Sequence, residues 1–381
     1  MKIGILMERR AHEKRCAATP ETVKKYIGLG AEVVVETGAG VAASISDAAF
    51  EAAGAKIAAD AAATVAGVDV VLKVQRPMTA AEGADELAQL PKCTTLIAIL
   101  NPHGAKEQVA SYAAAGVDAM AMELVPRISR AQSMDVLSSQ ANLAGYKAVI
   151  DAAAEFNRAF PMMMTAAGTV APARVLVMGA GVAGLQAIAT ARRLGAIVSA
   201  TDVRPASKEQ VKSLGATFVA VEDDEFKQAE TTAGYAKPMS EAYQAKQAAL
   251  IAENIQKQDI VITTALIPGR KAPVLVTEEM VKSMKAGSVI VDLAVEQGGN
   301  CPLSELGKVV EKHGVKLVGH ANVPSRLSAD STALYAKNLL NFVTLLIDKE
   351  SKQLKINWED EIVKGVALTK GGQVIHPNFQ G

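Results

Sequence analysis

The chain has 381 residues, of which 50% are hydrophobic and 4% aromatic, and this favours two α/β domains with aliphatic cores. Lysine plus arginine and aspartate plus glutamate number 40 each, so the formal net charge is zero, which excludes a basic field for nucleic acid and an acidic tail. The three cysteines are too far apart in sequence for a metal-ligand pattern or a disulfide framework, as is typical of a reducing compartment, and we expect neither a signal peptide nor a membrane-spanning segment.

The amino-terminal third of the chain alternates strand-like and helix-like segments, which predicts a parallel α/β domain without a glycine fingerprint. Thr19 and Pro20 are typical of the N-cap and the first position of a helix, and Gly30 follows its expected end. The expected strands are 2–6, 32–35, 68–74, 95–100 and 119–122, and the expected helices are 20–29, 47–53 and 105–115.

A second α/β domain follows a long helix that we expect over 138–160, closed by Pro161. Its later strands are expected at 217–221, 259–263, 288–292 and 316–318. A helix over 331–346 crosses back, and two strand-like runs around Lys370-Gly371-Gly372 predict a hairpin that packs on the first domain. We therefore predict an α/β protein with two Rossmann-like parallel-sheet domains, separated by a cleft and linked by long helices: residues 1–126 with 330–381, and residues 127–329.

The segment from 174 to 202 has the order of elements that a dinucleotide site needs. A strand-like run at 174–178 leads into Gly179-Ala180-Gly181-Val182-Ala183-Gly184, a helix former follows, and a second apolar run ends in Asp202. In this fingerprint the first glycine permits a tight turn, the second lets the backbone approach a pyrophosphate, and the third lets the helix pack on the strand. Asp202 would accept hydrogen bonds from the adenosine ribose and disfavour a 2′-phosphate, which predicts NAD(H). The alternative is a tight turn without a ligand.

Two further stretches depart from the regular pattern. Residues 222–243 are polar, acidic at their start, and contain Gly234 and Pro238. Long loops are usually functional, so we predict a mobile lid over the cofactor, with a solvated insertion as the alternative. Methionines 162–164 follow a proline, and we expect them to pack at a helix entry, because methionine fills gaps; the alternative is a pliable surface near a partner.

Hydrogen-bonding side chains concentrate between the two predicted domains, at Arg127, Ser129, Gln132, Asp135 and Ser138. Proteins of the α/β class place ligands in such clefts. The side chain of Gln132 is able to hydrogen-bond an amide, and the nicotinamide carboxamide is such an amide. We therefore predict that the loop 127–138 faces the nicotinamide.

This loop, with the segments 144–150, 160–169 and 263–269, closely resembles the soluble NAD(H)-binding α-subunit component (domain I) of proton-translocating NAD(P) transhydrogenases. The resemblance covers essentially the whole chain, and the Arg-x-x-x-x-Gln-x-x-Asp-x-x-Ser spacing is highly specific. It implies a homodimer that exchanges hydride between its NAD(H) and NADP(H) on a partner β subunit, and that is active only with this partner. It also implies a small membrane α subunit, proton translocation by the membrane component, and a cytoplasmic location on the inner face of the cell membrane through the partners.

The resemblance further implies a role for each matching residue. The loop residues Arg127, Gln132, Asp135 and Ser138 would position the nicotinamide and its ribose for transfer. The expected cofactor-binding residues are Arg127, Ile128, Ser129 and Gln132 in the loop, Gly179, Ala180, Gly181, Val182 and Gly184 in the glycine turn, Asp202, Val203 and Arg204 at the adenosine ribose, Gly234 and Tyr235 on the lid, and Leu266 in the pocket.

Alanine dehydrogenase is the alternative enzyme, because the amino-terminal segment also resembles that related family. Arg15 and Lys73 match the residues that hold the substrate carboxylate and carbonyl in the dehydrogenase. Two departures count against this alternative. The dehydrogenase has a catalytic histidine directly after the strand that matches 95–100, where this chain has Asn101 and His103 lies further on. An aspartate of the dehydrogenase's Val-Asp-Val-Ala-Ile-Asp-Gln-Gly-Gly segment is replaced by Glu296.

The distribution of histidines also favours hydride exchange between two nicotinamides. Oxidation of an amine or alcohol moves a proton as well as a hydride and needs a general base, whereas exchange between nicotinamides needs only apposition and exclusion of water. None of the five histidines lies in 127–138, and we expect all of them in turns or on the surface: His12, His103, His313, His320 and His376. A third alternative is a non-enzymatic NAD-binding module.

Overall fold

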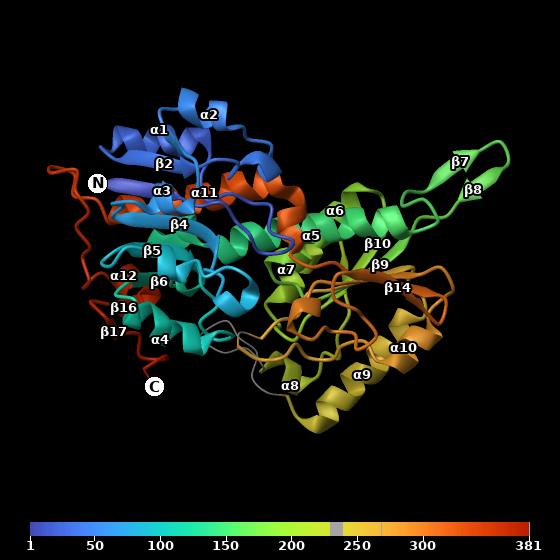
Figure 1. The fold of residues 1–381 in the computed structure, drawn as a ribbon. Helices are drawn as coiled ribbons and strands as arrows, with labels where there is room; N and C mark the ends of the chain where they lie inside the picture. Colours follow the sequence, from blue (N-terminus) through green and yellow to red (C-terminus); the bar gives the residue numbers. More distant parts are fainter. Residues whose placement is uncertain (229–238, 268, 381) are drawn as a thin grey trace. The chain divides into compact units, whose positions relative to one another are not determined.

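Two compact units make up the chain in a computed structural model that describes residues 1–228, 239–267 and 269–380 (Figure 1). The first unit comprises Met1–Gln140 and Ser325–Gly381, and the second comprises Ala141–Pro324. Each unit is built on a largely parallel sheet, which confirms the predicted class of two Rossmann-like α/β domains. The loop 127–138 belongs to the first unit, whereas the predicted boundary assigned it to the second domain.

The first unit contains a parallel sheet in the order β3-β2-β1-β4-β5-β6. Its strands are β1 (Lys2–Ile5), β2 (Glu32–Glu36), β3 (Lys56–Ala58), β4 (Val70–Gln75), β5 (Thr95–Ile99) and β6 (Asp118–Ala121). The central strands are almost continuously buried and rich in valine, isoleucine and leucine, as expected for a parallel sheet that is covered on both faces. Strand β3 was not predicted.

Helices cover the sheet of the first unit (Figure 1). They are α1 (Pro20–Gly28), α2 (Asp47–Ala52), α3 (Ala61–Val65), α4 (Lys106–Ala114), α11 (Ser328–Leu345) and α12 (Glu361–Val366). Helix α1 starts with the predicted Thr19 cap, whose side chain accepts the backbone N–H of Thr22. Helix α11 buries Tyr335 and Phe342 completely in the largest hydrophobic cluster of this unit. These buried side chains anchor α11 in the core of the first unit, where loops of the same unit pack against it.

The C-terminal hairpin consists of β16 (Thr369–Lys370) and β17 (Gln373–Val374). The Thr369 hydroxyl accepts the backbone N–H of Ala119 at 2.8 Å, and the N–H of Leu368 donates to the carbonyl of Ala119 at 2.8 Å. The hairpin therefore lies beside β6 of the first unit, and the short turn at Gly371 and Gly372 uses the positive φ that glycine adopts without strain.

The second unit contains a sheet in the order β11-β10-β9-β12-β13-β15-β14. Its strands are β9 (Arg174–Met178), β10 (Ile197–Thr201), β11 (Thr217–Phe218), β12 (Ile260–Thr263), β13 (Val289–Asp292), β14 (Lys308–Lys312) and β15 (Val315–Gly319). Only β14 runs antiparallel to its neighbour. The order changes direction at β9, and ligands of doubly wound folds bind at such a switch point, outside the carboxyl ends of the strands.

Five described helices accompany this sheet together with the long helix α5 (Val136–Glu155), most of which belongs to this unit. They are α6 (Val182–Arg193), α7 (Ser207–Ser213), α8 (Asp224–Lys227), α9 (Glu241–Ile255) and α10 (Glu278–Ser283). Two hydrophobic clusters, one on each face of the sheet, include residues of α6, α7, α9 and α10. The glycine turn of the sequence fingerprint thus connects the central strand β9 to α6, as the pattern predicts.

The stretch 222–243 is more ordered at its ends than the sequence suggested. Helix α8 begins after Asp223, whose carboxylate accepts the N–H of Phe226, and α9 begins after Ser240, whose hydroxyl accepts the N–H of Tyr243. The acidic start that suggested a solvated loop is therefore the capped first turn of a helix. The predicted lid residues Gly234 and Tyr235 lie outside the described residues.

The expectation that methionines 162–164 pack at a helix entry is wrong. Strands β7 (Met163–Thr165) and β8 (Gly168–Val170) form an antiparallel hairpin that projects from the second unit (Figure 1). The side chain of Met164 is 80% exposed. The physical reason is that the long helix α5 (Val136–Glu155) ends well before the methionines, so that no helix begins or ends there, and the turn hydrogen bond from Thr165 to Gly168 closes a hairpin instead.

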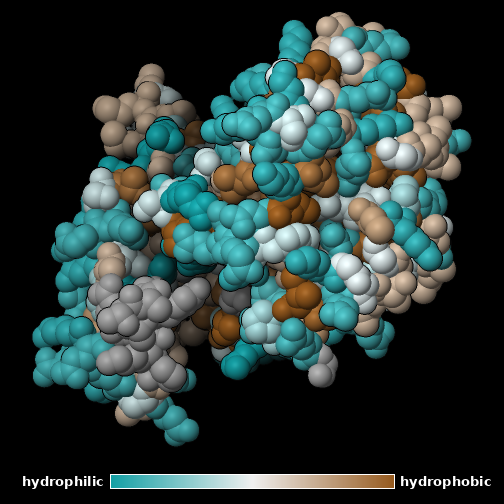
Figure 2. All heavy atoms as spheres, turned by 90° about the vertical axis from the view of Figure 1, so that its left-hand side faces the viewer, coloured by the Kyte–Doolittle hydropathy of each residue, from teal (hydrophilic) through white to brown (hydrophobic). Residues whose placement is uncertain are grey.

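Figure 2 shows one face, on which hydrophilic residues are interspersed with smaller groups of hydrophobic residues. Scattered exposed apolar residues of this kind are normal for globular proteins. Among the helices that the structure describes, none combines the length and the apolar character needed to cross a bilayer.

Candidate functional site

The glycine turn of the second unit has three glycines in three different environments. Gly179 has a φ of 105°, and a Cβ there would lie 2.4 Å from the Thr264 hydroxyl. A Cβ on Gly184 would lie 1.7 Å from the carbonyl oxygen of Gly179, so only glycine lets α6 pack this closely on the turn. Gly181 has an ordinary φ of −77°, and a Cβ there would meet no described atom within 4 Å. The space beside Gly181 therefore stays open for a ligand.

Helix α6 presents its N-terminus at this open space. Its N-cap is Gly181, which has no side chain to occupy the N–H groups of the first turn. Free N–H groups and the helix dipole together favour an anion at such an end. The turn, the open space and the helix end thus fit a pyrophosphate, as the fingerprint predicted.

Asp202 follows β10 and is 7% exposed on its side chain. Its carboxylate accepts the N–H of Ala180 in the glycine turn at 2.7 Å and the Nε–H and Nη2–H of Arg204 at 2.9 and 3.0 Å. Burial favours the protonated form, but the hydrogen bonds and charge of Arg204 outweigh it and lower the pKa of Asp202. An ionised acceptor is therefore fixed at the strand end where the fingerprint requires one, with Val203 exposed beside it.

A buried polar clamp holds the segment after β12, which carries Leu266. Asn300 is completely buried, donates from Nδ2 to the carbonyls of Ala265 and Pro273 at 2.9 and 2.8 Å, and accepts the N–H of Ala265 at 3.1 Å. The carboxylate of Asp292, in turn, accepts the N–H of Asn300 at 3.1 Å. The hydroxyl of neighbouring Thr264 donates to the carbonyl of Gly179 at 3.0 Å, so this segment is tied directly to the glycine turn.

Sequence reasoning missed this clamp, although its position was close to segments that it used. Asn300 comes directly after the segment whose Glu296 served to distinguish the two families, and nothing in that segment indicated that the next side chain is buried. Leu266 itself is 48% exposed and Ile267 is 42% exposed, although both are apolar. Ligand sites are lined mostly by apolar side chains, so these two are candidates for contact with a bound cofactor.

The predicted nicotinamide loop is built in the first unit around the 3-10 helix η5 (Ser129–Met134). Gln132 is exposed, as are Arg127 and Ser129, whereas Ile128 is half-buried. Asp135 accepts the backbone N–H and the hydroxyl of Ser138 at 2.9 and 2.5 Å, which makes it the cap of α5. Asp135 and Ser138 thus brace the loop, and Gln132 is the amide that it presents to solvent.

The cations that match the substrate-binding residues of alanine dehydrogenase are buried in the first unit. Arg15 donates to both carboxylate oxygens of Glu13, at 2.7 Å from Nε and 2.6 Å from Nη2. Lys73 Nζ lies 3.1 Å from Glu86 and 3.5 Å from Glu8. Burial raises the pKa of Glu13, but Arg15 more than compensates and lowers it to about 2. Both cations are therefore already matched by carboxylates of their own chain.

Two histidines and Phe379 form an aromatic group near the end of β5. The ring centroids of His103 and Phe379 are 5.0 Å apart, and so are those of His376 and Phe379. His376 is only 7% exposed, so the expectation that all histidines lie in turns or on the surface is wrong for this one. It is buried because the C-terminal segment folds back on the first unit. The His103 ring packs on a phenylalanine, which is a structural contact.

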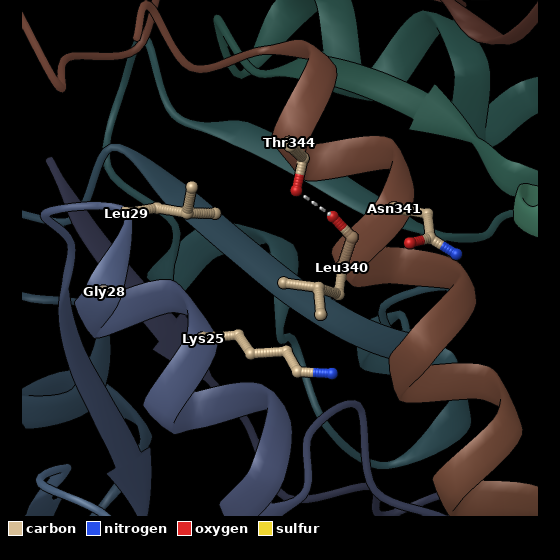
Figure 3. A pocket seen from close by; sticks show the side chains of 6 residues that line it. All are labelled: Lys25, Gly28, Leu29, Leu340, Asn341 and Thr344. Atoms are coloured by element: carbon tan, nitrogen blue, oxygen red, sulfur yellow. Dashed lines mark hydrogen bonds between the residues drawn. The ribbon is translucent and has the colours of Figure 1, made fainter.

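A separate shallow hollow of about 360 Å³ lies between α1 and α11 (Figure 3). It is lined by Lys25, Gly28, Leu29, Leu340, Asn341 and Thr344. None of the residues predicted to bind a nucleotide is among them.

The chain belongs to the alanine dehydrogenase/PNT family: it matches the N-terminal domain of that family over residues 4–144 and the C-terminal domain over residues 148–377. Within the family it is 61% identical to an NAD(P) transhydrogenase subunit alpha polypeptide of Rhodospirillum rubrum, over 100% of this chain and 99% of that protein. The crystal structure of transhydrogenase from Sinorhizobium meliloti is 56% identical, with a TM-score of 0.89 over 98% of this chain and 100% of that one. An alanine dehydrogenase of Halomonas elongata is 31% identical, over 92% of this chain and 88% of that protein. The comparisons confirm the resemblance that the motifs indicated.

Proposed function

We propose that this chain is the NAD(H)-binding component of a proton-translocating NAD(P) transhydrogenase and exchanges hydride directly with NADP(H) on a partner subunit. The observation that carries the proposal is the 61% identity to a transhydrogenase α-subunit polypeptide over essentially the full length of both chains. The glycine turn and the ionised Asp202 support it, because they fit a dinucleotide without a 2′-phosphate.

Residues of the second unit would hold the cofactor. The open face at Gly181 and the N-terminus of α6 would take the pyrophosphate, and Asp202 would accept the hydroxyls of the adenosine ribose, with Val203 and Arg204 beside it. Val182 and Leu266 would supply apolar contacts. When bound, NAD(H) supplies the chemistry itself, because its nicotinamide donates or accepts the hydride.

The loop of the first unit would orient the reacting ring. Gln132 is exposed and would hydrogen-bond the nicotinamide carboxamide, while Asp135 and Ser138 keep the loop in shape. Arg127 would complete the polar surface, together with Ile128 and Ser129. Exchange between two nicotinamides transfers no proton at the reacting carbons, so these side chains need to orient and to exclude water, and no general base is required.

An alanine dehydrogenase-like activity is the second candidate, favoured by the 31% identity to such an enzyme. Two observations disfavour it. The cations that would receive the substrate carboxylate and carbonyl are engaged with Glu13, Glu86 and Glu8. The histidine nearest the expected base position, His103, packs on Phe379. A substrate anion would have to displace internal carboxylates that are already in place.

The proposal extends to partners. The functional assembly would contain two copies of this chain, an NADP(H)-binding β subunit and a small membrane α subunit, and it would sit on the cytoplasmic side of the cell membrane. The membrane component would couple hydride transfer to proton translocation.

The variant Gln132→Asn tests the proposed orienting role. It should slow hydride transfer from NADH to an NADP analogue on the partner subunit far more than it weakens NADH binding. The side chain becomes one methylene shorter, and about 1 Å of misplacement can cost roughly a hundredfold in rate. Unchanged transfer in this variant would remove the role given to Gln132.

A further inference from the structure

A single buried amide on α11 joins the two ends of the turn that follows Gln132. Asn338 Nδ2 donates to the carbonyl of Ser133 at 2.8 Å, and Asn338 Oδ1 accepts the hydroxyl of Ser139 at 2.7 Å. Ser133 directly follows Gln132, and Ser139 lies in the first turn of α5. The intervening residues include Asp135 and Ser138, so one side chain spans the whole capped turn.

This amide is placed where an apolar residue would otherwise pack. Asn338 is 8% exposed, and its neighbours Leu339, Phe342 and Val343 are fully buried in the core of the first unit. A buried amide costs free energy unless it is hydrogen-bonded, and both ends of this one bond the loop and α5 instead of stabilising α11. A buried asparagine at this position is therefore explained by the loop and the first turn of α5, which its side chain holds together.

The carbonyl of Ser133 receives a second donor from the same helix, because Asn341 Nδ2 lies 3.0 Å from it. Figure 3 shows that Leu340 and Asn341 leave α11 in different directions. A 3-10 turn has poorer internal hydrogen-bond geometry than an α-helix, so two external amide donors restrain the end of η5 strongly.

Further hydrogen bonds connect this turn to a buried ion pair of the first unit. Gln140 Nε2 donates to the Ser139 hydroxyl at 3.3 Å, and Gln140 Oε1 accepts from Arg15 Nη1 at 2.8 Å. Arg15 is fixed by both oxygens of Glu13. The turn beside Gln132 is thus connected, through Asn338, Ser139 and Gln140, to an ion pair that is buried.

We propose that Asn338 is a positioning residue for hydride transfer, which sets the place of the Gln132 amide by holding Ser133 and Ser139 at a fixed separation. This inference rests on the proposed function, and it assigns to the buried Arg15–Glu13 pair the task of anchoring the same turn. Asn338 acts through Gln132 and does not itself touch a nucleotide.

The variant Asn338→Asp tests this role, because aspartate has the same size and still accepts the Ser139 hydroxyl but turns an oxygen toward the Ser133 carbonyl. Thr344→Val on the same helix is the matched control, since it is isosteric and removes only the bond from the Thr344 hydroxyl to the Leu340 carbonyl (Figure 3). With the full chain and an NADP(H)-binding partner subunit, transfer at saturating nucleotide should fall roughly tenfold or more in Asn338→Asp. The NADH dissociation constant should change less than about threefold, because only ring placement is disturbed, and Thr344→Val should match the unchanged chain.

Combination with Gln132→Asn separates positioning from simple loss of stability. If Asn338 acts through Gln132, Asn338→Asp adds less than about twofold to the defect of Gln132→Asn, whereas independent effects multiply. Multiplying defects, or normal transfer in Asn338→Asp, overturns the inference while leaving the proposed function intact. Absence of transfer by the unchanged chain with its partner overturns the proposed function itself. Asn338→Ala, which removes both bonds without adding a charge, should show the same pattern and serves if the aspartate variant does not fold.

Discussion

Gly181 offers a substitution that separates nucleotide binding from folding. Its φ of −77° suits alanine, and the added Cβ would meet no described atom within 4 Å. Alanine at a compatible position stabilises a chain by about 0.4–1 kcal/mol through the unfolded state, so the free Gly181→Ala chain should be as stable as the original or slightly more so. Within a nucleotide complex, the same methyl group would intrude on the pyrophosphate. Overpacking by one methyl costs about 1–3 kcal/mol, which corresponds to a rise in the NADH dissociation constant of about 5- to 150-fold.

Gly184→Ala is the matched comparison, because its Cβ would lie 1.7 Å from the Gly179 carbonyl oxygen and the turn would have to move. This variant should lose more than about 3 kcal/mol of unfolding free energy before any ligand is added. Urea unfolding measures stability, and NADH titration measures binding. A Gly181→Ala chain that binds NADH as tightly as the unchanged chain would refute the placement of the pyrophosphate at α6.

Three further outcomes are expected. Asp202→Ala should weaken NADH binding about tenfold or more and bring the NADH and NADPH affinities closer, because it removes both the ribose acceptor and the negative charge that disfavours a 2′-phosphate. Equilibrium dialysis with both nucleotides checks this, and an unchanged ratio of the two affinities would contradict it. Burial raises the pKa of Glu123 in the folded chain to about 7, above its unfolded value of 4.5. The folded chain therefore binds this proton more tightly than the unfolded chain, and the free energy of unfolding falls as the pH rises from about 4.5 to 7. Between about pH 5 and pH 8, the free energy of unfolding measured with urea should fall by up to about 3 kcal/mol more in the unchanged chain than in Glu123→Gln. Equal falls in the two chains would count against this assignment. Asn300→Ala should cost about 1–3 kcal/mol of unfolding free energy, because it leaves partly buried backbone groups of Ala265 and Pro273 without their partner. An unchanged urea midpoint would show that the clamp contributes nothing.

Most of the fold follows from local sequence signals, and the exceptions have physical causes. The apolar strands and the Thr19 cap are visible because periodicity and capping act within a few residues. Strand β3 was missed because it has three residues, and β14 was missed because it lies at a sheet edge with largely exposed side chains, so it lacks a clear apolar pattern. The β7–β8 hairpin was missed because a run of methionines carries a signal for burial but none for a projecting turn.

The candidate site divides in the same way. The glycine turn was predictable because the backbone leaves no room for a side chain at Gly179 and Gly184, and the acid at the end of β10 was predictable from its spacing to that turn. The roles of Asn300 and Asn338 could not be read from sequence, because each depends on hydrogen bonds to residues far along the chain: 35 residues away in the case of Ala265 and 205 in the case of Ser133. The predicted role of Asp135 needed the structure too, since only there is it seen to cap α5.

The most direct test of the account mixes the purified chain with an NADP(H)-binding partner subunit and follows hydride transfer from NADH to a bound NADP analogue. We predict rapid transfer only when both proteins are present, and no comparable turnover when the chain alone is given alanine and NAD. Robust oxidation of alanine by the isolated chain, or no transfer in the reconstituted pair, would contradict the account.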